Sequence, residues 1–421
     1  MAPRLLVLLS LVLLAGCQLE NRSADRPDAP PVTNADAEVS VYGDSDRTPT
    51  DADVEAGRRD TSWRGFAGRE ADYAVDTAQP DSMRAPQPAA PRPTRADTAA
   101  YAEALAVPLS ADTDGRAVLY AQILLDRARF SPGQIDGRWG QNTEKAVYWL
   151  QRREGLDASG TLDRPTLQRL VQLADAPRSP DSLLVLRTLT EDDVEGPFEE
   201  IPDDIYAKAE MERLTYQSVG EKLGEAYHVA PSLLREWRGG ALDGLAAGDT
   251  LRVPNLRPPT FEAEIDRLVV SDGGRYLHAL DAQGRILAHF PSTLGSDYDP
   301  SPSETQEIVS ITDYPGWHYQ PDILADVDDS EEDAHIPPGP NNAVGVVWME
   351  LSKEHYGIHG TAYPETIGHT ASAGCVRLTN WDAQTLAKHV EPGIEVAFRG
   401  TDGRGEQATS ADSTAAPRSR P

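Results

Sequence analysis

The hydrophobic positions divide the chain into a polar first stretch, two helical stretches and a β-rich last part. Residues 18–106 show no sustained apolar periodicity and are dominated by Pro, Ala, Asp, Arg, Ser and Thr, which predicts a disordered tether. Apolar residues then recur at helical spacing over 115–129, and two further helices are predicted after the capping residues Asn142 and Asp163. The pattern predicts a small three-helix domain over 107–175.

A second helical stretch follows over 201–256. Ser218 and Glu221 form a capping box that opens one helix, and Pro231 begins another. The letters GDTLRVP over 248–254 read as a turn and a strand. We expect a small α+β module with the order helix, helix, strand.

The β-rich part begins after residue 259. The runs RLVV, RYLHAL and RILAHF are rich in β-branched and aromatic residues and are separated by DGG and DAQG, which predicts a meander of hairpins. Further strands are predicted over 345–348 and 356–361. The sequence therefore indicates a multidomain chain that ends in a β-rich domain over 260–400 and a polar tail over 401–421.

The amino terminus reads as an export signal over 1–17. Arg4 precedes an apolar run over 5–14 that is too short to span a bilayer. An ordinary cleaved signal is one interpretation. The letters LAGC resemble the bacterial lipoprotein box, which implies lipidation of Cys17, and several acyl chains on one residue are enough for stable anchoring. By the same resemblance, Gln18 favours a periplasmic protein anchored to the outer membrane.

The composition limits what the chain can bind. Only 39% of its 421 residues are apolar, and it has 33 glycines and 33 prolines, so part of the chain is expected to be unfolded. A net charge of −29 argues against nucleic acid as a partner, because no basic patch would dominate such a field. The acidic run over 322–333 has no glycine at EF-hand spacing, so we expect a solvated insertion rather than a calcium site. No metal or cofactor is predicted.

The candidate chemistry lies around two residues, His359 and Cys375. Cys17 is the only other cysteine and is expected to carry lipid, which leaves Cys375 as a free thiol without a disulfide partner. An imidazole can activate a thiol by taking its proton. Gly360 and Gly374 allow close approach of a substrate and leave N–H groups free to face an oxyanion. The alternative is a buried structural cysteine with an unrelated histidine.

Three segments around these residues resemble the L,D-transpeptidase (YkuD-type) family of peptidoglycan enzymes: PPGPNNAVGVVWMEL, YGIHGT and SAGCVRLTNWDA. The resemblance covers roughly 262–398 and implies a β-rich sandwich with Cys375 as nucleophile and His359 as base. In one position the chain departs from the family signature, because the histidine that precedes Gly-Cys is Ala373 here. His369 lies nearby and could compensate, although nothing in its spacing demands this.

The resemblance also implies the reaction, which is acyl transfer through a thioester on the tetrapeptide stems of peptidoglycan. An amine would then attack, from a second stem peptide or from an outer-membrane lipoprotein. We expect the second ring nitrogen of His359 to be held by the carbonyl of Gly360 and the N–H groups of Gly374 and Cys375 to stabilise the oxyanion. Ser372 is expected to shape the loop through its hydroxyl.

A further set of residues is expected to bind substrate: Arg377, Tyr356 and Trp348. The guanidinium of Arg377 can hold a carboxylate as a fork, and the alternative is a structural ion pair. Two other functions stay open. The same fold can use water as acceptor, which gives an L,D-carboxypeptidase or amidase, or the domain can be inactive in a wall-binding lipoprotein.

Both upstream modules also resemble wall-binding families. The blocks IDGRWGQNTEKAV and GLDASGTLDRPTLQRL resemble a peptidoglycan-binding domain, and the alternative is a helical module that has lost binding. The module over 201–256 resembles a LysM-type glycan-binding module, although Gly239 and Gly240 stand near the family's usual asparagine, so a spacer is the alternative. Because the motif lies wholly beyond residue 260, a fragment that starts there is expected to keep its activity on soluble substrates.

Overall fold

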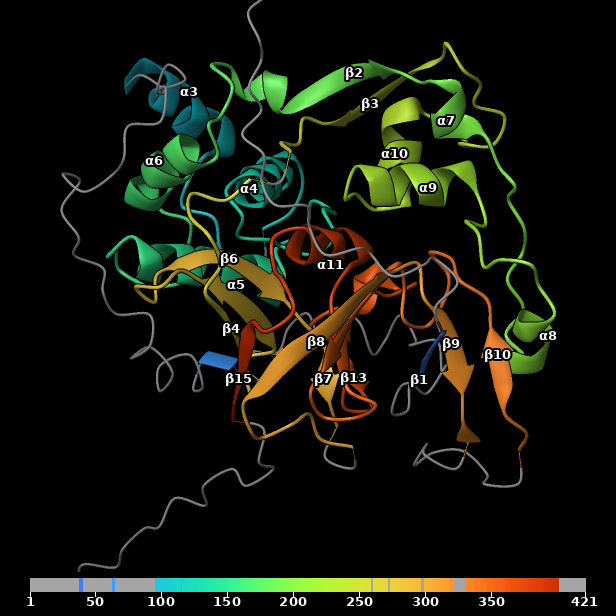
Figure 1. Cartoon of the computed structure of the whole chain (residues 1–421). Coiled ribbons are helices and arrows are strands. Elements are labelled where there is room, and N and C mark those ends of the chain that lie inside the picture. Colours follow the sequence, from blue (N-terminus) through green and yellow to red (C-terminus); the bar gives the residue numbers. More distant parts are fainter. Residues whose placement is uncertain are drawn as a thin grey trace, which may run out of the picture.

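The computed structural model describes residues 38–40, 63–64, 95–111, 113–258, 260–271, 273–296, 299–321 and 331–400 (Figure 1). The predicted export signal over 1–17, the polar tail over 401–421 and most of the acidic run over 322–333 lie outside these ranges. Within the described ranges, no helix combines the length and the apolarity needed to cross a membrane.

The first domain contains the three predicted helices and one more. Its helices are α3 (Arg95–Leu105), α4 (Arg116–Arg127), α5 (Gln141–Arg153) and α6 (Arg164–Leu173). The tether prediction is therefore wrong for 95–105, because Tyr101 and Leu105 are buried among the residues of the same apolar core as α4 and α6. Asp163 caps α6 as predicted, through a hydrogen bond from the Thr166 N–H.

The prediction that Asn142 caps its helix is wrong. The N-cap of α5 is Gly140, and Asn142 lies in the first turn. Its side-chain amide donates instead to the carbonyl of Ile367, 2.8 Å away in the β-rich domain. The residue that looked like a local cap therefore makes a contact between domains.

The second module is a two-stranded sheet with two helices. Its elements are β2 (Leu184–Thr188), α9 (Val219–Ala226), α10 (Pro231–Arg238) and β3 (Thr250–Pro254). β2 pairs antiparallel with β3, so the module begins before the predicted start at 201. Ser218 accepts from the Glu221 N–H and begins α9 as predicted. Between β2 and α9 the chain makes a long excursion that contains two short helices, α7 (Glu191–Val194) and α8 (Ile205–Ala209).

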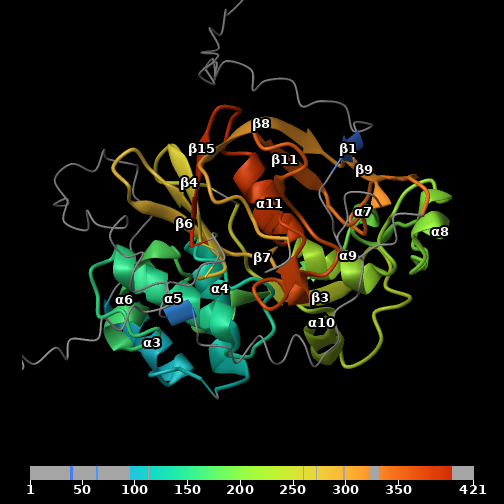
Figure 2. The same cartoon turned by 90° about the horizontal axis from the view of Figure 1, so that it is seen from below.

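The last domain is built on one mixed sheet of eight strands. Their order across the sheet is β14 (Val376–Arg377), β12 (Gly357–His359), β11 (Val347–Leu351), β8 (Gln306–Asp313), β15 (Glu395–Arg399), β4 (Arg267–Ser271), β5 (Tyr276–Leu280) and β6 (Ile286–Pro291). The predicted meander is confirmed, since β4, β5 and β6 are antiparallel neighbours. The helix α11 (Asn380–Ala387) lies between this sheet and the upstream helices (Figure 2).

Smaller sheets and a short helix complete the domain. β7 (Leu294–Gly295) pairs with β13 (Ala371–Ser372), and a 3₁₀ helix covers Pro364–Thr366. The hairpin of β9 (Gly316–Tyr319) and β10 (Ala334–Ile336) stands beside α8, with β1 (Glu38–Ser40) paired to β9 (Figure 1).

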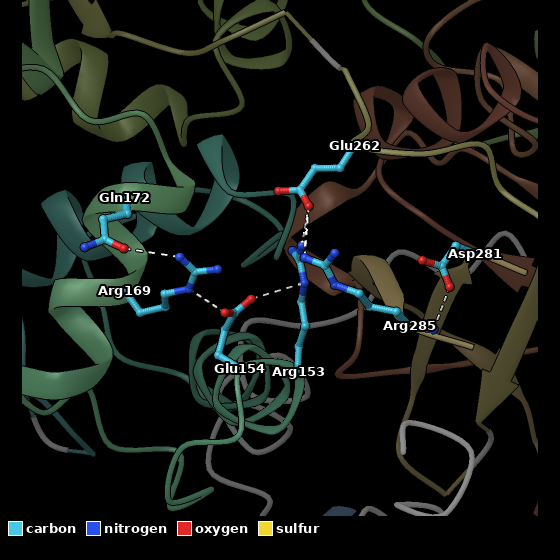
Figure 3. Close-up of polar contacts among 7 residues, drawn as sticks. All are labelled: Arg153, Glu154, Arg169, Gln172, Glu262, Asp281 and Arg285. Carbon is cyan, nitrogen blue, oxygen red and sulfur yellow. Dashed lines mark hydrogen bonds and ion pairs between the residues drawn. The ribbon is translucent and has the colours of Figure 1, made fainter. Parts of the chain in front are cut away.

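The three modules share buried surface. Trp149 of α5 lies edge-on to the rings of Tyr276 and His278 of β5, with centroids 5.0 and 4.6 Å apart. Nearby, the buried guanidinium of Arg153 donates to the carboxylate of Glu262 at 2.9 Å, and Arg285 donates to the same carboxylate (Figure 3). A buried charge needs such a partner, so this ion pair fixes how the first domain sits on the sheet.

Candidate active site

The two candidate catalytic residues lie at one edge of the large sheet, His359 within a strand and Cys375 immediately before the neighbouring strand. β12 and β14 run parallel, with His359 opposite Arg377. Cys375 directly precedes β14, so its thiol lies beside the start of β12, where the backbone N–H of Gly357 interacts with it. The sheet therefore brings together two residues that the chain separates by a loop over 360–374, which we call the catalytic loop.

His359 is held in one orientation. Its Nδ1 lies 2.7 Å from the carbonyl oxygen of Gly360, as the sequence predicts, and its ring stacks on Trp348. The side chain is 1% exposed. Burial lowers the pKa of His359 to about 4, and the hydrogen bond to Gly360 acts in the opposite direction. The neutral ring thus carries its proton on Nδ1 and leaves Nε2 free to accept one.

Cys375 is a buried thiol in this structure. It is 4% exposed, and its Sγ lies 3.8 Å from the carbonyl oxygen of His355. Burial raises the pKa of Cys375 to about 12, while the N–H of Gly357 and the charge of Lys353 act to lower it. The pair therefore rests as a neutral thiol beside a neutral imidazole rather than as an ion pair.

The end of the catalytic loop is tightly packed. The Ser372 hydroxyl donates to the carbonyl of Cys375 at 2.6 Å, which agrees with the expected role of Ser372 in shaping the loop. Gly374 has a φ of 100°, and a Cβ there would lie 2.7 Å from the ring of Tyr356. Only glycine fits this position without strain.

An apolar cluster surrounds the thiol. Cys375 packs in this cluster, which we call the Cys375 cluster, with Leu214, Trp317, Tyr319, Ala334, Ile336, Val344 and Trp348. The hairpin β9–β10 supplies half of these side chains, and Leu214 comes from the excursion that precedes α9. The backbone N–H of Leu214 donates to Pro338, and its carbonyl accepts from Asn341. A segment of the second module therefore packs next to the candidate nucleophile.

The three expected substrate-binding residues are close to the thiol but largely enclosed. Burial lowers the pKa of Arg377 to about 10. The Tyr356 ring packs on Gly374 and lies 3.8 Å from the Lys353 ammonium, while Trp348 packs on His359. In this closed form Tyr356 and Trp348 act as packing partners of the catalytic loop.

The sequence analysis missed Asn380, the first residue of α11. Its side chain is 1% exposed and makes four hydrogen bonds. Its oxygen accepts from the N–H groups of Val346 and Thr361, at 3.2 and 3.1 Å. Its amide donates to the carboxylate of Glu225 in α9 at 2.7 Å and to the carbonyl of Pro340 at 3.3 Å. The only signal in the sequence was an amide side chain within SAGCVRLTNWDA. Its hydrogen-bond partners lie far away in the chain, so the sequence does not reveal its role.

The middle of the catalytic loop contacts the first domain. Gln141 donates to the carbonyl of Gly368 at 3.1 Å, and its amide lies 3.2 Å from Nδ1 of His369. The His369 ring thus faces α5. Between the two domains lies a polar cleft whose lining includes Gln134, Asp136, Arg138, Asn142, Glu365 and His369.

No cluster of three or more His, Cys, Asp or Glu side chains suited to a metal ion occurs among the residues that the structure describes. The acidic run over 322–333 falls mostly outside them. The arrangement on the described residues is that of a thiol and a base, which can carry out nucleophilic acyl transfer without a metal ligand set.

Two known protein families match the chain, one over the β-rich domain and one over the first helical domain. A family model for the L,D-transpeptidase catalytic domain (YkuD) matches residues 265–397, and a model described as "Putative peptidoglycan binding domain" matches 114–170. The chain is 30% identical over 190 residues to the "Putative L,D-transpeptidase YkuD" of Bacillus subtilis (strain 168), which covers 44% of this chain and 98% of that protein.

Two further proteins show similarity to the chain. The protein of the same name from Bacillus licheniformis is 29% identical over 154 residues, which covers 37% of this chain and 76% of that protein. The crystal structure of an L,D-transpeptidase (residues 123–326) from Xylanimonas cellulosilytica is 14% identical, with a TM-score of 0.30, and the match covers 74% of this chain and 100% of that chain. That structural likeness is too slight to carry an argument. The match to the Bacillus subtilis protein over nearly its whole length shows that the chain belongs to the L,D-transpeptidase (YkuD) family, with a peptidoglycan-binding domain ahead of the catalytic domain.

Proposed function

We propose that this protein is a peptidoglycan L,D-transpeptidase that acts on tetrapeptide stems through a thioester on Cys375. The observation that carries the proposal is the orientation of His359. Because Nδ1 donates to the carbonyl of Gly360, the free nitrogen is Nε2, and Cys375 immediately precedes the strand that pairs with β12. Such a pair can pass a proton from sulfur to nitrogen during attack.

The proposed reaction has two steps. The thiol proton of Cys375 passes to Nε2 of His359 while sulfur bonds to the carbonyl carbon that follows the L-centre of the third stem residue. The backbone N–H groups of Gly374 and Cys375 stabilise the oxyanion, at about 3 kcal/mol for each donor. The C–N bond then breaks, and His359 returns the proton to the leaving D-amino acid. A second amine attacks the thioester and releases the free thiol.

The closed Cys375 cluster bears on how this reaction starts. A thiol whose pKa is raised to about 12 by burial, next to an imidazole whose pKa burial lowers to about 4, holds its proton firmly. We propose that substrate enters with opening of the cluster. A polar contact between the substrate carboxylate and Arg377 then replaces apolar contacts within the cluster. The opening exposes Tyr356 and Trp348, which contact the stem peptide.

The departure at Ala373 is compatible with this mechanism. The general base must reach the thiol proton, and we propose His359 for this role because β12 pairs with β14, the strand that follows Cys375. His369 contacts α5 through Gln141, so it is not proposed as a second base. The alanine removes a side chain from the pocket wall and leaves the base in place.

The upstream modules are proposed to hold the enzyme on the wall. The first domain belongs to a peptidoglycan-binding family, and the strand–helix–helix–strand order of the second fits a LysM-like glycan-binding module. The amino terminus is proposed to be a lipoprotein signal, with Cys17 anchored in the outer membrane and the folded part in the periplasm. The acyl acceptor is proposed to be an amine of a second stem peptide or of an outer-membrane lipoprotein.

The test is incubation of the purified protein with defined tetrapeptide muropeptides, followed by mass spectrometry of the products. We expect release of the terminal D-amino acid and formation of a cross-linked dimer, both abolished in Cys375→Ser. Loss of the D-amino acid without a dimer or an exchange product would make water the acceptor and the protein a carboxypeptidase. If wild type and Cys375→Ser gave the same products, the nucleophile assignment would be wrong.

A further inference from the structure

The proposed base is supported from outside its own domain. The carbonyl of Gly360 fixes the tautomer of His359, so the position of Gly360 decides which ring nitrogen faces the thiol. Gly360 is held by the side chain of Asn380. A Cβ on Gly360 would lie 2.1 Å from the Asn380 side-chain oxygen. Any residue other than glycine at position 360 would therefore clash with Asn380. A Cβ on Gly345 would also lie 2.1 Å from the Asn380 side-chain oxygen, so this position requires glycine for the same reason.

The amide of Asn380 can lie in only one of its two orientations. Its oxygen faces two backbone donors, the N–H groups of Val346 and Thr361. Its nitrogen faces two acceptors, Glu225 and Pro340. A flipped amide would set N–H against N–H and oxygen against oxygen, which leaves buried groups unpaired.

Of the two acceptors, Glu225 makes the shorter contact and is the one with a carboxyl group. Its second carboxylate oxygen accepts from the Tyr216 hydroxyl at 2.8 Å, so both oxygens are occupied. Hydrogen bonds to a carboxylate are stronger than those between neutral groups. Glu225 belongs to α9 of the LysM-like module, far in sequence from the catalytic motif.

We propose that Glu225 is a positioning residue for His359, acting through Asn380 and the backbone at Gly360 and Thr361. This inference rests on the proposed function of His359 as the base. Glu225 touches neither the thiol nor the substrate. Its contribution is to hold the Asn380 amide so that the Gly360 carbonyl keeps Nδ1 of His359 protonated.

The module offers a matched control. Glu221, one turn earlier on α9, accepts in the same way from the side-chain amide of Asn341, at 2.7 Å. Asn341 also donates to the carbonyl of Thr215, and neither residue reaches Asn380 or His359. Glu221→Ala therefore removes a comparable contact between the same two modules, together with the bond from the Gln217 N–H at the start of α9. It leaves the bonds from Asn380 to Glu225 and from Thr361 to Asn380 in place, so any effect of a loosened α9 shows in this control.

The experiment uses the full chain with ¹⁵N-labelled histidine, and a His359→Asn variant assigns the His359 signals. Wild type should show a single Nδ1–H tautomer at His359 in the ¹⁵N shifts. Glu225→Ala should show a mixture of both tautomers and a kcat for acyl transfer that is lower by about tenfold, with KM changed less than twofold. Glu221→Ala should match wild type in both readouts. The tautomer reports on positioning even if the protein proves not to be a transpeptidase, so the two proposals can fail separately.

A second pair of variants tests the proposal even if Glu225→Ala does not fold. Asn380→Asp sets two carboxylates against each other and should lose activity. Asn380→Asp with Glu225→Gln restores the short hydrogen bond between these two positions with donor and acceptor exchanged, but not the longer one to the carbonyl of Pro340. It should therefore recover part of the lost kcat, by at least about threefold over Asn380→Asp. The proposal is overturned if Glu225→Ala keeps a single tautomer and a normal kcat, if Glu221→Ala has the same effect as Glu225→Ala, or if the double variant is no better than Asn380→Asp.

Discussion

The two ends of the catalytic loop are stabilised in different ways. On the His359 side, the contacts are directional: a buried amide on Asn380 bonds to two backbone N–H groups, a carbonyl and a carboxylate. On the Cys375 side, the contacts are apolar and come from the Cys375 cluster. Hydrogen bonds fix orientation, whereas apolar packing excludes water without fixing direction.

This difference suits the two tasks. A base has to present one nitrogen, so its surroundings must be directional. A nucleophilic thiol, the role that we propose for Cys375, has to be protected until substrate arrives, which apolar cover achieves. The same upstream module supplies Glu225 on one side and Leu214 on the other. The second module is thus built into both halves of the site.

The most severe test of that comparison is a fragment that begins at residue 260. The sequence alone favoured an active fragment, because the motif lies beyond that point. The structure leads us to expect the opposite: removal of the upstream modules exposes Tyr276 and His278, leaves Glu262 without Arg153, and removes Glu225 and Leu214. We expect no cooperative thermal transition by circular dichroism and at least a hundredfold loss of acyl transfer. A fragment that melts cooperatively and turns over like the full chain would show that the module contacts are dispensable.

The next largest effect is expected on the directional side. His359→Ala should lower kcat by about 10²–10⁴-fold, the range for loss of a general base. The matched control is His369→Ala, whose ring contacts Gln141 on α5, and its loss should stay below tenfold. Steady-state kinetics on a defined tetrapeptide would measure both. A larger loss for His369→Ala than for His359→Ala would exchange their roles.

The sequence predicted the parts of the site that are local in the chain. The relation of Cys375, Gly374 and Ser372 follows from one short motif, and the bond from His359 to Gly360 spans adjacent residues. The residues behind them depend on contacts between distant segments. Asn380 has no role in the sequence prediction, because its partner Glu225 is reached through folding of another module.

The same reason explains the errors in the fold. α3 was missed within the tether because its apolar residues become buried only against α4 and α6, and its own periodicity is weak. β2 was missed because it is an exposed strand, with Leu186 71% exposed, whose pairing partner is β3 at the far end of the module. Local patterns predicted most helices and strands, and long-range pairing decided the rest.

The apolar side can be opened without touching the base. Leu214 is fully buried, so Leu214→Ala should destabilise the protein by about 2–5 kcal/mol through the cavity it leaves. We expect alkylation of Cys375 by iodoacetamide, followed by peptide mass mapping, to become at least fivefold faster. Leu242→Ala removes a similarly buried leucine of the same module outside the Cys375 cluster and should not accelerate alkylation. Equal rates for Leu214→Ala and wild type would mean that Leu214 does not guard the thiol.

The smallest effect is expected at α11, where the modules meet. Burial raises the pKa of Asp382 to about 7, and the nearby Asp126 acts in the same direction. The Ser131 hydroxyl, which donates to Asp382 at 2.7 Å, and His228 act to lower it. A carboxyl whose pKa is about 7 when folded and 3.8 when unfolded binds more protons in the folded state between these values. Stability from this group is therefore present below about pH 4 and is lost as the pH rises toward 7.

Asp382→Asn keeps an acceptor for Ser131 and removes the titration. Other carboxylates also titrate in this range, so the quantity to compare is the difference in Tm between the two proteins from pH 4 to pH 8. We expect the Tm of Asp382→Asn to rise relative to that of wild type as the pH increases from 4 to 8, by about 2–4 °C for each kcal/mol of stability that wild type loses over this range. Parallel Tm curves would show that Asp382 is ionised in the folded protein. A charged carboxylate would then lie in α11, where the three modules meet. The site would have a polar His359 side, an apolar Cys375 side and a buried charge beside them.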